Sequence, residues 1–276
     1  MRVTAALWVR NLRTFVRNKP ALIINLVFPF FFIFVFSEIF NMGDIENPIS
    51  YMLAGIIVAM VFDSSFRVSS STIDDMTSGF MKEVLVSPIS RLNIAIGQFV
   101  SSATVATVQG MIIFGVGFFI GYRITSPFTV FMSIAAMVFM GLVLAGFGLL
   151  LATISKNTQT FQAISIAITM PMTFLSGAYI PLTMLPTALQ WVGYFNPMTY
   201  AVALFRTITL ERLNSPVDAL VLEGLAFEIG NVTITAVESF VILVVFGAVF
   251  LGLATLAFSR VDFSRMNRSK EDYIEF

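Results

Sequence analysis

The 276-residue sequence has no cysteine, no histidine and only four lysines. Without cysteine the chain forms no disulfide, no thiolate nucleophile and no Cys-ligated metal centre. Without histidine it lacks the base of a Ser-His-Asp triad and the usual ligands of zinc and haem. Each lysine follows a residue other than glycine, which excludes a Walker A phosphate loop. We therefore predict no catalytic residue, no metal site and no cofactor in this chain.

Charge is also scarce. Charged residues make up 12% of the chain, whereas a soluble domain has about a quarter. Hydrophobic residues make up 57%, and the mean hydropathy is +0.90. The sixteen basic and sixteen acidic residues cancel, so no basic surplus is available for nucleic acid. The composition excludes disorder and fibres, and predicts an all-α integral membrane protein with a single transmembrane domain.

Long apolar runs define the predicted spans. A helix needs about 20 mostly apolar residues to cross the bilayer. Six segments qualify, at about 21–40, 50–71, 94–121, 128–152, 160–180 and 234–257. Basic residues precede the first, as in a signal peptide, but its apolar stretch is too long and no small-x-small cleavage site follows. We interpret it as a retained span.

The basic residues are distributed unequally between the two sides that these spans define. Of the sixteen, only Arg123, Arg206 and Arg212 fall in segments on the second side. The positive-inside rule then predicts that both termini are cytoplasmic. We expect a multi-pass protein of the plasma or inner membrane, in contact with membrane lipids.

The stretch 187–210 is apolar enough to suggest a seventh span. Gly193 and the pair Asn196-Pro197 break it into pieces too short to cross, and a seventh span would place the basic C-terminal tail outside. We therefore expect 181–232 to be an outer segment whose apolar helices dip into the outer leaflet without crossing.

Residues 1–19 have the pattern of a basic amphipathic helix. Trp8 and neighbouring apolar residues gather on one face, while Arg10, Arg13 and Arg17 gather on the other. This pattern is typical of a helix in the membrane interface. It serves either as an anchor or as a lever between a cytoplasmic partner and the first span, and the pattern alone leaves both open.

A second amphipathic helix is predicted over residues 73–87, in the cytoplasmic loop after span two. It ends at Ser87-Pro88, because proline cannot continue a helix. The helix is either an interfacial anchor or a docking surface for a soluble partner. Its apolar residues recur at helical spacing and are Ile73, Met76, Phe80, Met81, Val84 and Leu85.

Two of the predicted spans carry polar stripes. In span two, Asp63, Arg67, Ser70 and Asp74 share one helix face. A charged residue at the bilayer centre costs about 2.5–3.5 kcal/mol, which an ion pair or a wet cavity offsets. We expect Asp63 and Arg67 to form such a pair. The stripe of span five consists of Gln162, Ser165, Thr169, Thr173 and Ser176.

The two stripes together favour a hydrated substrate path between spans two and five. Alternatively, the hydroxyl and amide groups only hold helices together, at about 0.6–2 kcal/mol per hydrogen bond. No dense set of intramembrane carboxylates appears, although a proton- or sodium-coupled transporter would usually have one. We therefore expect the energy source to lie outside this chain.

Residues 169–206 resemble the membrane subunits of ATP-binding-cassette exporters, the type-2 permease family that handles drugs, polysaccharides and lipids. The loop 85–90, Leu-Val-Ser-Pro-Ile-Ser, is also typical of this family. The pieces of the family motif are Leu175-Ser176-Gly177-Ala178, Leu185-Pro186, Pro197-Met198-Thr199-Tyr200 and Arg206.

The resemblance implies roles for these features. Residues 1–19 would be the connecting helix and 73–87 the coupling helix, which rests in a groove of the ATPase. The loop that contains Lys156 would be a second, smaller coupling contact. Spans two and five would line the substrate path of a dimer, and 181–232 would form re-entrant helices that cap the exit.

We thus expect an exporter permease for a lipophilic or amphiphilic substrate. Two copies of this chain, as a homodimer, would assemble with two ATP-binding-cassette ATPase subunits, which would hold the ATP and magnesium. The alternative from another class is a self-sufficient secondary carrier or channel that uses Asp63 and Arg67. A membrane enzyme acting on lipids lacks the acidic cluster it would need.

Overall fold

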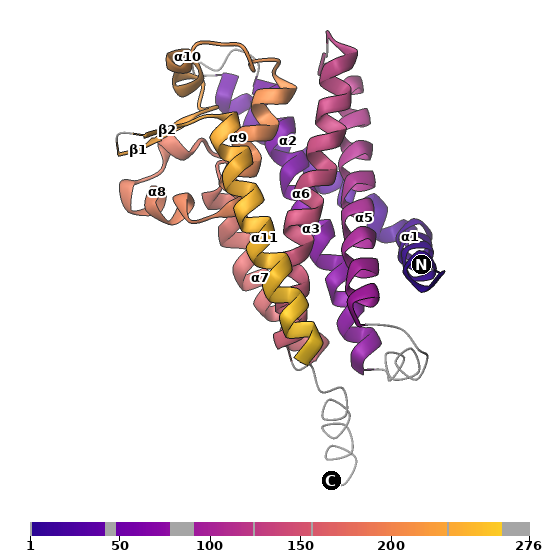
Figure 1. The fold of residues 1–276 in the computed structure, drawn as a ribbon. Coiled ribbons are helices and arrows are strands. Elements are labelled where there is room, and N and C mark those ends of the chain that lie inside the picture. The colour runs from indigo at the N-terminus through magenta and orange to yellow at the C-terminus, as the bar shows by residue number, and fades with distance from the viewer. Residues whose placement is uncertain are drawn as a thin grey trace.

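The computed structural model describes residues 2–41, 48–77, 91–123, 125–155, 157–230 and 232–260, and most of them are helical (Figure 1). The longer helices are α1 (Arg2–Arg17), α2 (Lys19–Asn41), α3 (Pro48–Thr77), α5 (Arg91–Ile120), α6 (Pro127–Ile154), α7 (Thr158–Leu175) and α11 (Ala236–Arg260). The segment between α7 and α11 contains η1 (Leu182–Met184), α8 (Thr187–Tyr194), α9 (Pro197–Thr209), α10 (Val217–Leu222), β1 (Phe227–Ile229) and β2 (Val232–Ile234).

Local sequence signals start several of these helices. Ser126, Asn157 and Asn196 precede α6, α7 and α9, and each side chain accepts a hydrogen bond from a backbone N–H of the first turn. Pro127 and Pro197 follow two of them at the first helical position, where the missing N–H costs nothing. Within the helices, Pro29 interrupts α2 and Pro171 interrupts α7.

The predicted number of six spans is not confirmed. Four helices of the described residues, α3, α5, α6 and α11, are long and apolar enough to cross a membrane. A fifth span is added if α1 and α2, bent by 67° between Arg17 and Lys19, are one broken span. The span predicted at 160–180 corresponds to α7, which ends at Leu175, and its glutamine and threonine residues lower its hydropathy.

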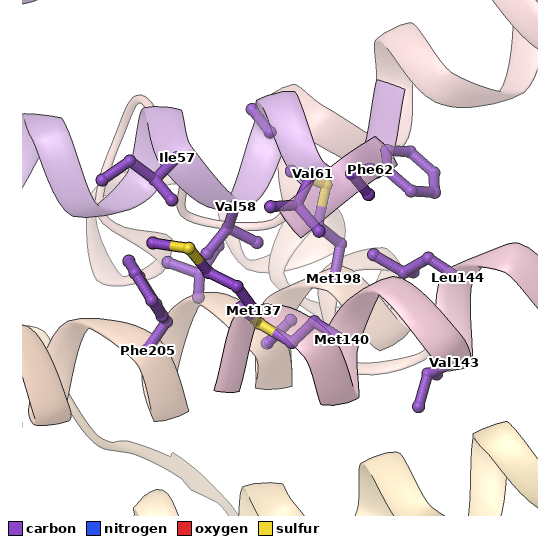
Figure 2. Packing of buried hydrophobic residues seen from close by; sticks show 14 of the residues in the cluster. Ile57, Val58, Val61, Phe62, Met137, Met140, Val143, Leu144, Met198 and Phe205 are labelled. Atoms are coloured by element: carbon purple, nitrogen blue, oxygen red, sulfur yellow. The ribbon is translucent and has the colours of Figure 1, made fainter. Parts of the chain in front are cut away.

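The core lies where α3, α6 and α9 meet. Figure 2 shows Val61 of α3 facing Met137 and Met140 of α6, with Met198 and Phe205 of α9 beside them. All five side chains are buried, and they belong to one continuous cluster. Because lipid is as apolar as these side chains, van der Waals packing rather than transfer out of water stabilises such a contact in the membrane.

Helices α3 and α11 occupy opposite positions in the bundle. The most apolar window of α3 is 78% buried by protein, whereas that of α11 is only 17% buried. In Figure 1, α11 lies along the outside of the bundle. Helix α3 is therefore the central element, and most of α11 is exposed in the single chain.

Helix α9 corrects the expectation for the outer segment. All thirteen of its residues are buried by protein, so α9 belongs to the protein core and has no exposed apolar face. By contrast, α8 and the turn after it expose Trp191, Val192 and Phe195. Leu222 of α10 is 87% exposed as well, so the exposed apolar surface of this segment lies on both α8 and α10.

The elements divide clearly between two ends of the bundle. In Figure 1, α8, α10 and the β1–β2 hairpin lie at one end, while the C-terminal ends of α6 and α11 lie at the other. The antiparallel hairpin pairs Phe227 with Ile234 and Ile229 with Val232. It departs from the all-α prediction, since two three-residue strands leave too little alternation to be recognised in the sequence.

The boundary after span two was also predicted wrongly. Helix α3 continues without a break to Thr77, so Ile73 is part of α3 and not of a separate helix that begins there. The Ile73 side chain is fully buried in the main core. It is therefore inaccessible to a docking partner and stabilises the C-terminal end of α3 instead.

Candidate functional site

A polar groove of about 270 Å³ lies between α3 and α7. Residues from both predicted stripes line it, together with the aromatic rings of Phe66 and Phe161. The structure thus brings together six of the seven residues predicted for the substrate path, which are Asp63, Arg67, Ser70, Gln162, Ser165 and Thr169.

Asp63 and Arg67 form the expected ion pair on the wall of this groove. The Arg67 Nε–H donates to Asp63 Oδ2 at 2.9 Å, and Nη2 donates to the same oxygen. Nη2 also donates to Asn25 Oδ1 of α2 at 2.8 Å. In the single chain the two charged side chains are 44% and 50% exposed, so the pair lies on an open surface where its partners can be exchanged.

The α7 side of the groove has one unsatisfied hydroxyl. Ser165 is almost fully buried, and its Oγ has no hydrogen-bond partner among the described residues. Thr173, the seventh predicted residue, does not line the groove, and its hydroxyl donates to the Thr169 carbonyl within α7. Beyond the groove, Thr158 Oγ1 at the start of α7 donates to Asp74 Oδ1 near the end of α3 at 2.6 Å and links the two helices.

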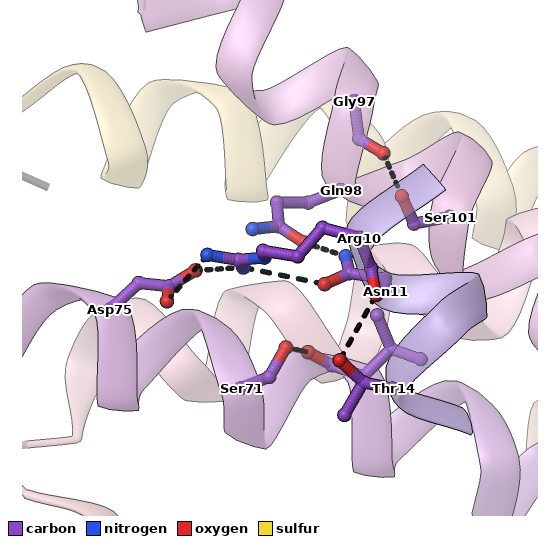
Figure 3. A network of polar contacts seen from close by, with 9 residues as sticks. Arg10, Asn11, Thr14, Ser71, Asp75, Gly97, Gln98 and Ser101 are labelled. Carbon is purple, nitrogen blue, oxygen red and sulfur yellow. Dashed lines mark hydrogen bonds and ion pairs between the residues drawn. The ribbon is translucent and has the colours of Figure 1, made fainter. Parts of the chain in front are cut away.

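Helix α1 is fastened to the bundle by polar side chains (Figure 3). Arg10 forms an ion pair with Asp75 near the end of α3. Asn11 Nδ2 donates to Gln98 Oε1 of α5 at 3.0 Å in a buried position. One turn earlier, the indole N–H of Trp8 donates to Thr104 Oγ1 of α5 at 3.0 Å.

These contacts differ from the apolar and basic faces that the amphipathic pattern predicts for α1. The buried residues of α1 include polar Asn11 beside Leu7, while apolar Val16 is 55% exposed. Arg13 and Arg17 are exposed, as the amphipathic pattern predicts, but Arg10 is turned toward Asp75. Burial of α1 therefore follows its hydrogen bonds as much as its apolar stripe.

The family motif forms a separate cluster around Arg206 of α9. This side chain is 1% exposed, and its Nη2 donates to the Gly177 and Ala178 carbonyls at 3.1 and 3.2 Å. The guanidinium lies over the ring of Tyr51, 3.5 Å from the ring centre. A cation–π contact and two carbonyls thus hold this buried cation.

Two glycines allow this cluster to close. A Cβ at Gly55 of α3 would lie 2.0 Å from the Ala178 carbonyl oxygen and 2.8 Å from Arg206 Nη2. Gly177 has φ of +86°, in the left-handed region that favours glycine. The turn after α7 can therefore approach α3 only because both positions lack a side chain.

The other motif residues make backbone contacts at the end of α7 and within segment 181–232. Ser176 Oγ donates to the Thr173 carbonyl and accepts from the Ala178 N–H, while Tyr200 Oη donates to the Tyr194 carbonyl at 2.6 Å. Pro186 and Pro197 lie at the starts of α8 and α9. The motif residues thus hold the outer segment in shape and do not line the groove.

Glu211 links the end of α9 to the start of α6. It adopts φ of 58° just after α9, and its carboxylate accepts hydrogen bonds from Thr125, Ser126 and Thr129. The side-chain hydrogen bond from Thr125 contributes most to lowering the pKa of Glu211 below its usual 4.5. The carboxylate also lies at the positive end of the α6 dipole.

Most of the predicted coupling residues cannot be placed. Met76 lies in the last turns of α3. Phe80, Met81, Val84, Leu85 and Lys156 lie outside the described residues. Sequence reasoning missed Asn25, Asn11 and Gln98 as contact residues, although a lone amide in an otherwise apolar helix is a recognisable signal of interhelical hydrogen bonding.

A helical bundle with four or five helices apolar enough to cross a membrane, and a groove with polar residues between two helices, defines the class as a multi-pass membrane protein. The sequence matches the ABC-2 type transporter family over residues 2–210. Since this match covers well over half of the chain, the protein belongs to that family. It is a transport permease of an ABC transporter, a family whose members work with an ABC ATPase.

Several relatives carry corresponding names. The chain is 25% identical over 252 residues to ycf38 of Cyanophora paradoxa, named a transport permease, covering 87% of this chain and 84% of the relative. It is 31% identical over 158 residues to the multidrug ABC transporter permease YbhR of Escherichia coli K12, covering 56% and 42%. Identity to the inner membrane transport permease YadH of the same strain is 22% over 209 residues, covering 73% and 80%.

Proposed function

We propose that this permease exports a lipophilic or amphiphilic substrate through the groove between α3 and α7. The observation that carries the proposal is the meeting of two polar stripes, from α3 and α7, on one open groove in an apolar bundle. Aromatic Phe66 and Phe161 lie beside the polar residues, so the groove offers contacts to both parts of an amphiphile.

The groove can bind and release cargo because its charges are already paired. Asp63 and Arg67 neutralise each other, so neither has to enter the membrane as an isolated ion. Both are about half exposed in the single chain. A second copy facing this groove would enclose the pair and complete the substrate path, which supports the homodimer with two ATPase subunits that we propose.

The energy source that we propose is the partner ATPase. ATP and magnesium would bind in the partner, and closure of the ATPases would move the ends of α3 and α7 through the cytoplasmic loops. Both chain termini would be cytoplasmic.

Purification of the tagged chain from its native membrane tests this function. We expect an ATP-binding-cassette ATPase to co-purify and to give vanadate-sensitive ATP hydrolysis in liposomes, with outward movement of a lipophilic dye. The chain stripped of this partner should hydrolyse no ATP. Robust hydrolysis by the chain alone would contradict the proposal, and dye flux driven by an ion gradient without ATP would favour a secondary carrier.

The coupling loop has its own test. Phe80→Asp would place a charge among the apolar residues of segment 73–87 that we propose to dock on the ATPase. We expect ATP-driven transport to be lost while the thermal stability of the permease stays within error. Asp74→Asn, which changes a residue bonded to Thr158 rather than the proposed docking face, is a matched comparison. Normal transport by Phe80→Asp would show that this surface does not couple.

A further inference from the structure

A second cavity, which we name the inner pocket, lies between α1, α2 and α3. Its volume is about 450 Å³, and one of its walls comes from α5. Ligand pockets for small amphiphiles have volumes of about 300–1,000 Å³, so the inner pocket is large enough for one. The residues that line the inner pocket include Phe15, Leu22, Ser64, Arg67, Val68 and Val105.

Helix α3 separates the inner pocket from the groove. Ser64, Val68 and Ser71 line the inner pocket, while Asp63 and Ser70 line the groove. Arg67 is shared by the two walls, because it lines both spaces. Its guanidinium reaches Asp63 on the groove side and Asn25 of α2 on the other.

Two donors at this end of the inner pocket are available to a ligand. Ser64 is 2% exposed, and its hydroxyl has no hydrogen-bond partner among the described residues. Arg67 uses Nε and Nη2 for Asp63 and Asn25, and within the same part of the chain Nη1 makes no hydrogen bond. Ser64 and Arg67 are three residues apart on one helix face, which places their side chains next to each other.

The rest of the inner pocket has a different character. Phe15 of α1, Leu22 of α2 and Val105 of α5 supply apolar wall. The carboxylates of Asp74 and Asp75 also line it, but they lie seven and eight residues further along α3, about 10 Å or more along the helix axis. Asp75 is paired with Arg10, which lines the same end of the pocket, whereas the Arg67 end offers the Ser64 hydroxyl and Arg67 Nη1 as hydrogen-bond donors. A phosphate or carboxylate head is therefore expected at the Arg67 end.

We infer that the inner pocket binds an amphiphile from the inner leaflet, with an anionic phosphate or carboxylate head on Ser64 and Arg67 and its chain against Phe15 and Leu22. The inference rests on the proposed function, since it makes the pocket the site from which cargo reaches the groove. Arg67 can give up its hydrogen bond to Asn25, bind the head group instead and still remain paired with Asp63. Because the guanidinium lines both spaces, it can contact the head group from the inner pocket or from the groove.

Fluorescence quenching measures this binding directly. The full chain has only two tryptophans. Trp8 is kept because its indole N–H fastens α1 to Thr104, and Phe15→Trp in a Trp191→Phe background adds one reporter on the pocket wall, read as the difference from the Trp191→Phe chain. The chain is placed in phosphatidylcholine nanodiscs and titrated with brominated phosphatidic acid or with dibromostearate. We expect either or both to quench at several-fold lower mole fraction than brominated phosphatidylcholine. The two arms distinguish the phosphate head from the carboxylate.

Matched variants connect the signal to the two donors. Ser64→Ala should raise the mole fraction for half-quenching about fivefold, as expected for one lost hydrogen bond to a charged group. Ser65→Ala is the control, because Ser65 lines neither space and its hydroxyl donates to the Val61 carbonyl. Arg67→Gln should raise the same mole fraction about tenfold or more.

A filling variant covers the case in which a polar variant folds poorly. Ala21→Trp should occupy the inner pocket and abolish the preferential binding of radiolabelled phosphatidic acid or stearate, whereas Val27→Trp on the exposed side of α2 should not. For these two, binding is read by displacement of a radiolabelled probe, since they add a tryptophan. Equal quenching by all three lipids, or equal affinity of Ser64→Ala and Ser65→Ala, would overturn the inference.

The binding assay contains no ATPase and no ATP. Preferential binding without ATP-driven transport in the reconstituted complex would therefore contradict the proposed export function and leave the inner pocket standing. ATP-driven transport without preferential binding would contradict the inner pocket as a lipid site and leave the proposed export function standing.

Discussion

Two arginines of this protein show two ways of placing a cation in an apolar bundle. Arg67 is paired with a carboxylate and half exposed on a groove, whereas Arg206 is 1% exposed and held by two carbonyls and an aromatic ring. A charge on an open wall can change partners at low cost, because water is close. A buried charge cannot, because desolvation penalises every arrangement that leaves it unsatisfied. The first position suits binding of cargo, and the second suits fixed structure.

The largest effect is expected from Arg206→Met. It leaves the Gly177 and Ala178 carbonyls without their donor, at about 1–3 kcal/mol each. We expect a loss of about 3 kcal/mol or more in stability, measured as a large fall in the apparent Tm of the purified protein. Arg212→Met, at an ion pair with Glu223 that is about one third exposed, should cost less than about 1 kcal/mol. Equal stability of the two variants would remove the distinction between the two arginines.

Gly55→Ala tests the same cluster from the opposite side. Its Cβ would lie 2.0 Å from the Ala178 carbonyl oxygen, so α3 or the turn after α7 must move. We expect a destabilisation of about 1–3 kcal/mol, as for other overpacked sites. Gly252→Ala in α11 is the control, since nothing lies within 4 Å of the added carbon; helix propensity there favours alanine by up to about 1 kcal/mol. A neutral Gly55→Ala would mean that the turn is free to shift.

Arg67→Ala should separate transport from stability. Both members of its ion pair are about half exposed in the single chain. Since the substrate path that we propose is hydrated, water can solvate Asp63, and the loss of stability should stay below about 1 kcal/mol. ATP-driven transport in liposomes should nevertheless fall strongly, because the groove then carries an uncompensated Asp63. Ser70→Ala, on the same wall of the groove, provides the comparison for a small polar change. Full transport by Arg67→Ala would show that cargo does not pass this wall.

The smallest effect is a pH dependence at Glu211. Its folded-state pKa lies below its usual 4.5, mainly through the hydrogen bond from Thr125. The carboxylate therefore stabilises the link to α6 above the unfolded-state pKa, and this contribution is lost as the pH falls through the folded-state pKa. Glu211→Gln should show a smaller fall in Tm between pH 6 and pH 3 than the unchanged protein. Parallel curves for the two proteins would argue that this link does not matter for stability.

The groove could be predicted from the sequence better than the cluster around Arg206, for a physical reason. The stripes of α3 and α7 repeat at helical spacing, so each can be read locally, and the Asp63–Arg67 pair lies within one helix turn. The partners of Arg206 are 28 and 29 residues away. No local pattern predicts which carbonyls an arginine far away in the sequence will contact. The family resemblance identified Arg206 as a motif residue but did not identify its hydrogen-bond partners.

Other errors came from treating apolarity as a sign of lipid contact. Helix α9 is as apolar as an interfacial helix, yet protein buries all of it. Helix α1 has a clear apolar stripe, but hydrogen bonds of Asn11 and Trp8 decide how it docks. The continuation of α3 to Thr77 was not predicted, because the polar residues from Asp74 onward are also typical of the start of a separate amphipathic helix.

The way α1 is attached has a mechanical consequence. Side chains tie this helix to α3 through Asp75 and to α5 through Gln98 and Thr104, while the chain turns by 67° before α2 begins. A push on α1 from the cytoplasm would thus be delivered sideways, as a torque on the two helices it grips. Helix α2 would then rotate about this bend. Because α2 lines the inner pocket, the pocket would become wider or narrower as α2 moves.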